Sequence, residues 1–212
     1  MKLHRFIFSP FQENTYVIWD DITNESCIID PGCYSNSEED ELKEFIISNK
    51  LTVKYLINTH CHIDHIFGNL FIKTEFDPIF LTPQKDVPLL NMAIEQGKQF
   101  GIKVNPSPLP DKYIDELESL NIGNIELKFI FTPGHTPGEY CIYIPEENIC
   151  ITGDVLFKES IGRTDLWKGN YETLMNSIRT NLLTLPDETE IFPGHGSSST
   201  IGYEKLNNSF LQ

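Results

Sequence analysis

The most constraining feature of the sequence is a local pattern that recurs five times. A short apolar run rich in β-favouring residues ends abruptly at a polar or glycine-rich corner. Runs of this length bounded by Gly and Pro are typical of β-strands. The corners carry His or Asp side chains, and loops at one edge of a rigid sheet are a common place for active groups. The runs are 27–29 before Asp30, 53–59 before His60, 127–132 before His135, 149–152 before Asp154 and 190–192 before His195.

Helical patterns lie between these runs. Ser37, followed by three acidic residues, predicts a helix N-terminus that leads into apolar residues at helical spacing. Residues 87–100 predict a second helix, and Asn170 is placed to cap a third that ends near Pro186. Strands with interspersed helices predict a single domain over residues 1–212 with layered α and β structure. Periodicity alone does not specify the order of the layers.

Charge and composition exclude several kinds of partner. With 16 Lys and Arg against 31 Asp and Glu, the formal net charge is −15, which repels phosphate backbones, so we expect no nucleic-acid partner. No apolar run approaches the roughly 18 residues of a membrane span, and the first residues do not form a secretory signal.

Five cysteines without a close-spaced pair predict reduced, core-packed thiols. We therefore expect a cytoplasmic protein that acts on a small molecule, and its oligomeric state stays open.

Five of the six histidines lie at three of the corners. The segment 59–65, THCHIDH, places four metal-capable side chains close together. His60 and His62 are two residues apart, so both can point to one side of an extended loop. Asp64 and His65 are adjacent and could reach a second position beside the first.

Three later residues, His135, Asp154 and His195, complete a set of seven candidate ligands. Seven groups suit two metal ions a few ångströms apart, with one carboxylate shared between them. Imidazole and carboxylate without thiolate would suit zinc, iron or manganese, and the spacing does not choose among these metals.

The pattern H-x-H-x-D-H, followed by a distant His, Asp and His, resembles the metallo-β-lactamase superfamily. The resemblance covers nearly the whole chain, from Asn14 to His195. Residues 132–138 (TPGHTPG), 162–166 (GRTDL) and 192–196 (FPGHG) are similar to glyoxalase II and its small relatives. The resemblance implies an α+β fold, an αββα sandwich of two mixed β-sheets flanked by helices, with metals at one edge between the sheets.

The same resemblance implies which residues hold the metals, in two sets of three with one shared carboxylate. The sets are His60, His62 and His135 for one ion, and Asp64, His65 and His195 for the other, with Asp154 as the bridge. The expected cofactors are two divalent metal ions, zinc first, with iron or manganese as alternatives. Asp64 and Asp154 are the expected catalytic residues, and no further cofactor site is predicted.

Two divalent ions lower the pKa of a water held between them, and one of them can polarise a substrate carbonyl. A thiol with an ordinary pKa of about 8.5 leaves as thiolate without protonation, whereas an amine or alkoxide generally needs an acid. We therefore predict a dinuclear thioester hydrolase, similar to hydroxyacylglutathione hydrolase, in which a metal-bound hydroxide attacks. The alternatives are a mono-iron oxidoreductase similar to persulfide dioxygenases and a lactone or ester hydrolase of the same fold. Glyoxalase II carries a C-terminal helical domain that contacts glutathione, and 17 residues follow His195 here, so another thioester or an ester is also a candidate substrate.

Four further residues are weaker candidates. Asp30 could orient a metal ligand, with a plain turn as the alternative. Arg163 and Asp165 could brace the site or contact substrate, with a structural ion pair as the alternative. Cys61 lies between two expected ligands, and alternation should turn its thiol away from the metal.

Overall fold

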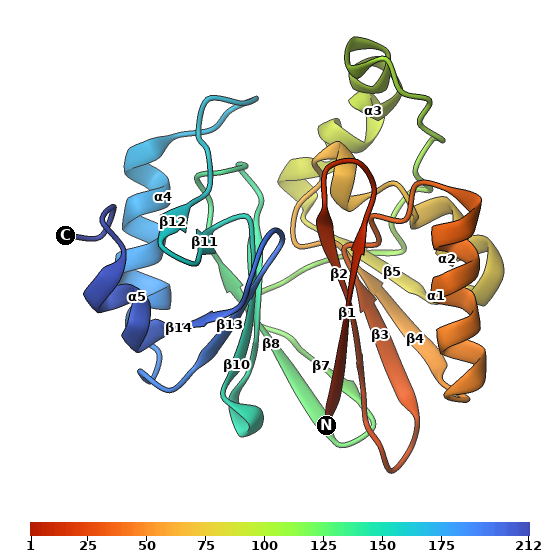
Figure 1. Ribbon diagram of the computed structural model, residues 1–212, viewed down its shortest axis with the longest axis horizontal. Coiled ribbons are helices and arrows are strands. Elements are labelled where there is room, and N and C mark those ends of the chain that lie inside the picture. The colour runs from red at the N-terminus through yellow and green to blue at the C-terminus, as the bar shows by residue number, and fades with distance from the viewer. The chain divides into compact units, whose positions relative to one another are not determined.

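The computed structural model describes residues 1–212, and its first sheet begins as an antiparallel meander. The strand β1 pairs with β2 and β2 with β3 in antiparallel register, whereas β3, β4, β5 and β6 pair in parallel. The result is a six-stranded mixed sheet in the order β1-β2-β3-β4-β5-β6 (Figure 1). Its strands are β1 (Lys2–Phe8), β2 (Glu13–Trp19), β3 (Glu25–Ile29), β4 (Thr52–Ile57), β5 (Ile79–Thr82) and β6 (Lys112–Tyr113).

The parallel strands of this sheet are joined through helices. These are α1 (Asn36–Ser48), α2 (Asn69–Phe76) and α3 (Val87–Phe100), with short 3-10 turns η1 (Ile63–His65) and η2 (Gln84–Asp86). The start of α1 is a capping box in which the Ser35 hydroxyl accepts the Glu38 N–H and the Glu38 carboxylate accepts the Ser35 N–H. The predicted cap at Ser37 was therefore wrong by two residues, because Glu38 occupies the third helical position after Ser35. The predicted helix over residues 87–100 is α3.

The second sheet is also mixed, in the order β14-β13-β10-β9-β8-β7, with a parallel pair between β10 and β13. A two-stranded hairpin, β11–β12, follows β10. The strands are β7 (Ser119–Ile122), β8 (Ile125–Phe131), β9 (Tyr140–Ile144), β10 (Ile149–Gly153), β11 (Leu156–Phe157), β12 (Ser160–Ile161), β13 (Glu190–Pro193) and β14 (Ser199–Thr200), with a 3-10 turn η3 (Pro145–Glu147).

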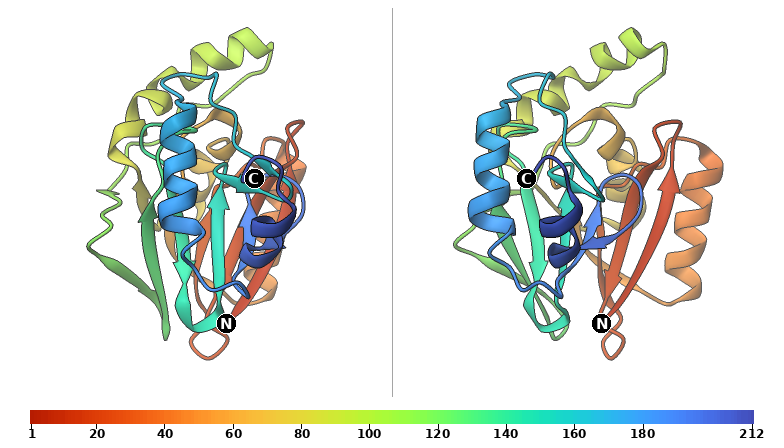
Figure 2. Two further views of the ribbon diagram at one scale, coloured as in Figure 1. Left: turned by 90° about the vertical axis from the view of Figure 1, so that its left-hand side faces the viewer. Right: turned by 60° about the vertical axis from the view of Figure 1, so that its left-hand side comes forward.

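The C-terminal half carries α4 (Tyr171–Ser177) and α5 (Ile201–Asn207) (Figure 2). Asn170 caps α4 as predicted, since its side-chain oxygen accepts the Thr173 N–H at 2.8 Å. The helix runs on as a π-helical turn, η4 (Ile178–Leu182), and stops before Pro186.

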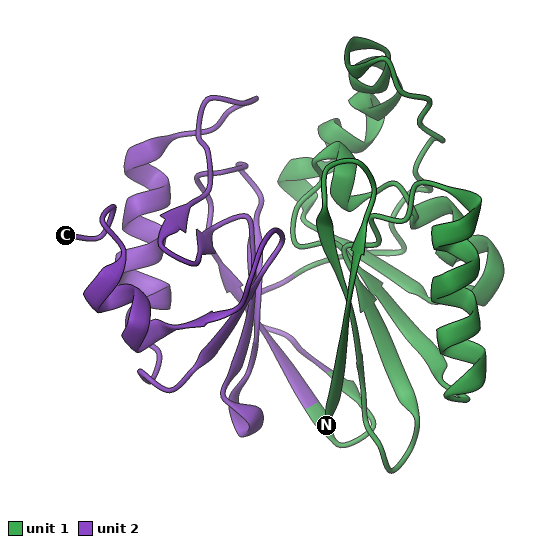
Figure 3. Cartoon of the chain, in the orientation of Figure 1, with its two compact units in different colours: residues 1–114, 121–125 green, residues 115–120, 126–212 purple.

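The chain divides into two compact units, each built mainly on one of these sheets (Figure 3). Unit 1 comprises residues 1–114 and 121–125, and unit 2 comprises residues 115–120 and 126–212. A single domain over residues 1–212 stays a prediction. No helix is both long enough and apolar enough to cross a lipid bilayer.

Each unit has its own apolar core. In unit 1, strand residues such as Ile28 and Leu56 pack with Leu42 and Ile46 of α1 and Ile72 of α2. In unit 2, buried residues of β9, β10 and β13 pack with the apolar face of α4, η4 and α5. Fully burying one such Leu or Ile contributes roughly 1.5–3 kcal/mol, so these clusters hold the strand ends in place. The predicted fold class, two mixed sheets flanked by helices, and all five predicted strand runs are confirmed.

Candidate metal centre

In unit 1 the motif HCHIDH (residues 60–65) begins shortly after β4, separated from it by Asn58 and Thr59. His60 and His65 are fully buried, His62 is 8% exposed, and the Asp64 side chain is 14% exposed. The His60 ring centroid lies 4.9 Å from that of His62 and 4.1 Å from that of His65. Asp64 Oδ2 lies 3.9 Å from His65 Nε2. The four predicted donors of this motif are therefore brought together by an extended loop and the η1 turn.

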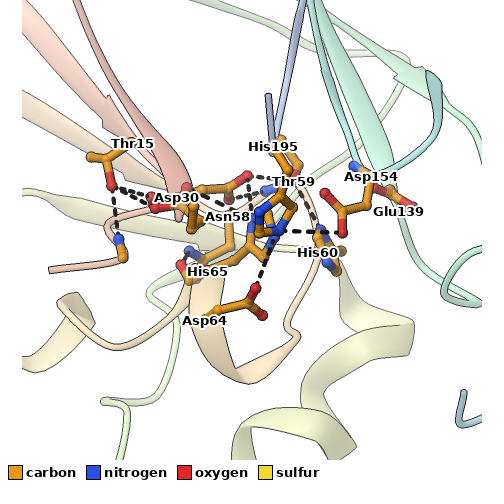
Figure 4. A network of polar contacts seen from close by, with 12 residues as sticks. Thr15, Asp30, Asn58, Thr59, His60, Asp64, His65, Glu139, Asp154 and His195 are labelled. Atoms are coloured by element: carbon orange, nitrogen blue, oxygen red, sulfur yellow. Dashed lines mark hydrogen bonds and ion pairs between the residues drawn. The ribbon is translucent and has the colours of Figure 1, made fainter. Parts of the chain in front are cut away.

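Asp30, at the end of β3, orients two of these imidazoles (Figure 4). Its Oδ1 accepts the Thr59 N–H at 2.7 Å, and its Oδ2 accepts the Thr59 hydroxyl at 2.6 Å and lies 3.2 Å from His65 Nδ1. The Thr59 oxygen lies 3.1 Å from His60 Nδ1. Because the Thr59 proton is given to Asp30, its oxygen accepts Nδ1–H of His60. Both rings thus carry their proton on Nδ1 and keep a lone pair on the buried Nε2.

A second buried carboxylate, Glu13, supports this arrangement and was missed by sequence reasoning. Its Oε1 lies 3.9 Å from His65 Nδ1, and the Thr15 hydroxyl lies 2.8 Å from its Oε2. Burial raises the pKa of Glu13 well above its usual range. The Gly32 backbone passes so close that an added Cβ would lie 2.0 Å from Glu13 Oε2. The available signal was an acidic residue in β2, a strand whose residues are all buried.

In unit 2 one carboxylate lies beside two imidazoles. Asp154 Oδ2 is 3.5 Å from His135 Nε2 and 3.8 Å from His195 Nε2. The parallel pairing of β10 with β13 places Gly153 opposite Pro193, so Asp154 and His195 follow their strands at the same edge. Within unit 2, the Asp154 carboxylate therefore lies close to the Nε2 atoms of both histidines.

Two further hydrogen bonds within unit 2 fix the positions of His135 and Asp154. His135 Nδ1 lies 2.7 Å from the Arg163 carbonyl oxygen, an acceptor, so Nδ1 carries the proton and Nε2 the lone pair. The fully buried Glu139 accepts the Asp154 N–H at 2.7 Å through Oε1. Sequence reasoning missed Glu139, although an acidic residue at the end of the TPGHTPG corner, immediately before a strand, was an available signal.

The three remaining weaker candidates lie in different environments. The Arg163 and Asp165 side chains, 62% and 69% exposed, form a bidentate ion pair at 2.7 and 2.8 Å, and Arg163 lowers the pKa of Asp165 to about 2. It is the backbone of Arg163, rather than its guanidinium, that contacts His135. Cys61 turns away as predicted, with its buried Sγ 2.8 Å from Thr82 Oγ1, and its burial raises the pKa of the thiol.

The donor set of each unit fits a divalent metal. Unit 1 offers three imidazoles and a carboxylate, and unit 2 offers two imidazoles and a carboxylate, with no thiolate among them. An imidazole whose Nδ1–H is held by a carboxylate, hydroxyl or carbonyl is the usual arrangement of a metal-ligating histidine. Nitrogen and oxygen donors of this kind suit zinc, iron or manganese.

Asp30→Asn tests the role of Asp30. The change keeps the size of the side chain but replaces one acceptor oxygen with a donor, which cannot accept both the Thr59 hydroxyl and His65 Nδ1–H. The proton of the His65 ring can then move from Nδ1 to Nε2, and Nε2 would no longer offer a lone pair to a metal. We expect metal affinity to fall by about 10- to 100-fold, measured by competition with a chelating dye.

Asp20→Asn is the matched control for this variant. Asp20 is another buried acid of unit 1, and it accepts hydrogen bonds from the Ile22 and Asn124 amides. Its replacement should lower thermal stability and leave metal affinity unchanged. Parental metal affinity in Asp30→Asn would contradict the orienting role of Asp30.

Comparisons with known proteins agree with this geometry. The profile of the Metallo-beta-lactamase superfamily matches residues 8–195. The chain is 41% identical to "Hydroxyacylglutathione hydrolase GloC" of Haemophilus influenzae, over 100% of this chain and 98% of that protein. Among solved structures, it superposes on the BLEG-1 B3 metallo-beta-lactamase with a TM-score of 0.91 and 32% identity, covering 100% of both chains. It also superposes on TTHA1623 in a di-iron-bound form, with a TM-score of 0.88 and 30% identity, covering 98% of this chain and 100% of that one. The chain belongs to the metallo-β-lactamase superfamily.

Proposed function

We propose that this metallo-hydrolase cleaves thioesters at a centre that holds two divalent ions. The proposed ligands are those that the motif pattern implies, drawn from both units. They are His60, His62 and His135 for one ion, Asp64, His65 and His195 for the other, and Asp154 for both. Zinc is the proposed metal, and the di-iron form of a structural neighbour makes iron the main competitor.

When bound, two such ions supply Lewis acidity toward the substrate carbonyl and a water of lowered pKa. The chain's own residues do the positioning. Asp30 and Thr59 fix the tautomers of His60 and His65, and the Arg163 carbonyl fixes that of His135. Asp154 is proposed to keep the two ions at a constant separation, with its main chain held by Glu139.

The use of the histidines is the observation that carries the thioester proposal. Five of the six histidines belong to the proposed ligand set, and three of them have Nδ1 engaged and Nε2 assigned to metal. The sixth, His4, lies on β1 and stacks on Phe45 at a ring-centroid distance of 4.4 Å. No histidine is therefore left to protonate a departing amine or alkoxide. A thiolate leaves without that proton, which favours thioesters over amides and oxygen esters.

Sequence similarity to a named relative supports the same class of substrate. The GloC relative, which is matched over the full length of this chain, is named a hydroxyacylglutathione hydrolase. The net charge of −15 supports a small-molecule substrate rather than nucleic acid. A cytoplasmic location stays a prediction.

The test compares the hydrolysis of substrates that differ in their leaving group. Metal-loaded protein is assayed for thiol release from S-lactoylglutathione and from a simple thioester, and for hydrolysis of the matching oxygen ester. A cephalosporin is included because one structural neighbour is a β-lactamase. We expect about two metals per chain, and thioester turnover at least about tenfold faster than that of the ester. Preference for the cephalosporin or the ester, or one iron per chain with persulfide-dependent oxygen uptake, would overturn the proposal.

A further inference from the structure

Two fully buried asparagines lie behind the ligand-bearing turn of unit 1. Asn58 directly follows β4, and Asn69 is the first residue of α2. Their amides pair with each other: Asn69 Nδ2 donates to Asn58 Oδ1 at 2.8 Å, and Asn58 Nδ2 donates to Asn69 Oδ1 at 3.3 Å. The backbone N–H of Asn58 donates to the Leu81 carbonyl of β5 at 3.0 Å. The pair is therefore anchored to the end of the sheet.

Each amide also reaches one outside group. Asn58 Nδ2 donates to the His65 carbonyl oxygen at 3.0 Å, and Asn69 Nδ2 donates to Ser107 Oγ at 3.0 Å. Ser107 lies in the proline-rich segment between α3 and β6. The pair thus uses its donors to tie the turn that carries Asp64 and His65 to the sheet on one side and to that segment on the other.

His65 is consequently held at two points. Its imidazole is held through Nδ1 by Asp30, and its main chain is held through the carbonyl by Asn58. An amide suits position 58 because the side chain donates twice, to the His65 carbonyl and to Asn69 Oδ1, and also accepts from Asn69 Nδ2. A carboxylate there would lose both donors and face the His65 carbonyl with a second acceptor, in a buried environment where such mismatches are costly.

We propose that Asn58 and Asn69 are positioning residues of the metal centre, which fix the backbone of His65 so that its Nε2 is presented to a metal. This inference rests on the proposed metal centre. A purely structural role for the pair would lower stability in proportion to the lost hydrogen bonds and leave intrinsic metal affinity unchanged. Metal affinity and apo-protein stability therefore have to be measured separately.

The decisive variant is Asn58→Asp, which is nearly isosteric. Metal affinity is measured for each of the two equivalents by competition with a chelating dye, and the stability of the metal-free protein by thermal melting. We expect one equivalent to bind at least about tenfold more weakly and the other to bind within about twofold of the parent. Asn69→Asp should weaken the same equivalent, and the double variant should lose less affinity than the sum of the two, because both act through one pair.

Two controls separate positioning from destabilisation. Ile46→Val trims a buried core residue of α1 that is neither a proposed ligand nor part of the asparagine pair, and it should lower apo-protein stability without changing either affinity. Asn49→Asp removes an exposed side-chain donor to the Phe45 carbonyl at the end of α1 and should likewise leave both affinities unchanged. If Asn58→Asp does not fold, Asn69→Asp answers the same question from the other end of the pair.

The outcomes are distinct. If the parent protein binds no divalent metal, the proposed function is wrong, and the inference that rests on it is wrong with it. If the parent binds two ions and the Asn58 and Asn69 variants bind both with parental affinity, the function stands and the inference is wrong. A loss of affinity in Ile46→Val as large as in Asn58→Asp would also overturn it, because stability alone would then explain the effect.

Discussion

Asp154→Ala is expected to abolish turnover while leaving the protein folded. Asp154 Oδ2 is the oxygen that lies 3.5 Å from His135 Nε2 and 3.8 Å from His195 Nε2. Its loss would remove the proposed shared ligand and leave the two ions without a fixed separation. A cost of about 4 kcal/mol in transition-state stabilisation corresponds to roughly a thousandfold loss in kcat/KM. Thiol release is the measurement, with metal content determined on the same samples.

Glu188→Ala is the matched control, since it removes an exposed carboxylate from the same unit. It should retain parental activity and metal content. The circular dichroism spectrum of Asp154→Ala should be unchanged, because its truncated side chain contributes to the site rather than to the apolar core. An Asp154→Ala protein that keeps two metals and near-parental turnover would refute the assignment of Asp154 as the shared ligand.

Gly162→Ala is expected to lower activity strongly because it displaces the main chain of Asp154. A Cβ on Gly162 would lie 1.8 Å from the Asp154 carbonyl oxygen and 3.3 Å from His135 Cβ. Real Cβ atoms do not approach an oxygen so closely, so the Asp154 main chain must move. A misplacement of about 1 Å can cost roughly a hundredfold in rate, and we expect a loss of at least that size in kcat/KM. Thermal melting should also show reduced stability.

Gly101→Ala is the control for the glycine substitution. Gly101 ends α3 with a φ of +70°, and a Cβ there would meet no atom within 4 Å. The change should cost about 1 kcal/mol of stability through backbone strain alone and leave kcat/KM unchanged. Parental activity in Gly162→Ala would show that the Asp154 position tolerates the shift and would count against the geometry described for unit 2.

Local patterns in the sequence were sufficient to predict five of the strands and to nominate the seven candidate donors. Each of these five strands is a short apolar run that ends at a polar or glycine-rich corner, and each donor is a His or Asp at or near such a corner, so both are visible within a few residues. Helix ends were less well predicted. Ser37 was a plausible cap, but Ser35 is the cap because the reciprocal bond with Glu38 selects it.

Of the groups that orient the donors, only Asp30 was proposed from the sequence, and the donors that it contacts were not. Asp30 reaches His65 across 35 residues, and Glu139 reaches Asp154 across 15. The acceptor for His135 Nδ1 is the carbonyl of Arg163, 28 residues away, and the acceptor for the Asn58 amide is the carbonyl of His65. Which residues can bind a metal follows from side-chain chemistry, which can be recognised from each residue type in the sequence. Which imidazole nitrogen is left to bind a metal depends on main-chain oxygens and buried carboxylates that only folding brings next to the ring. Because every residue has a main-chain oxygen, the sequence gives no sign of which one will be the acceptor.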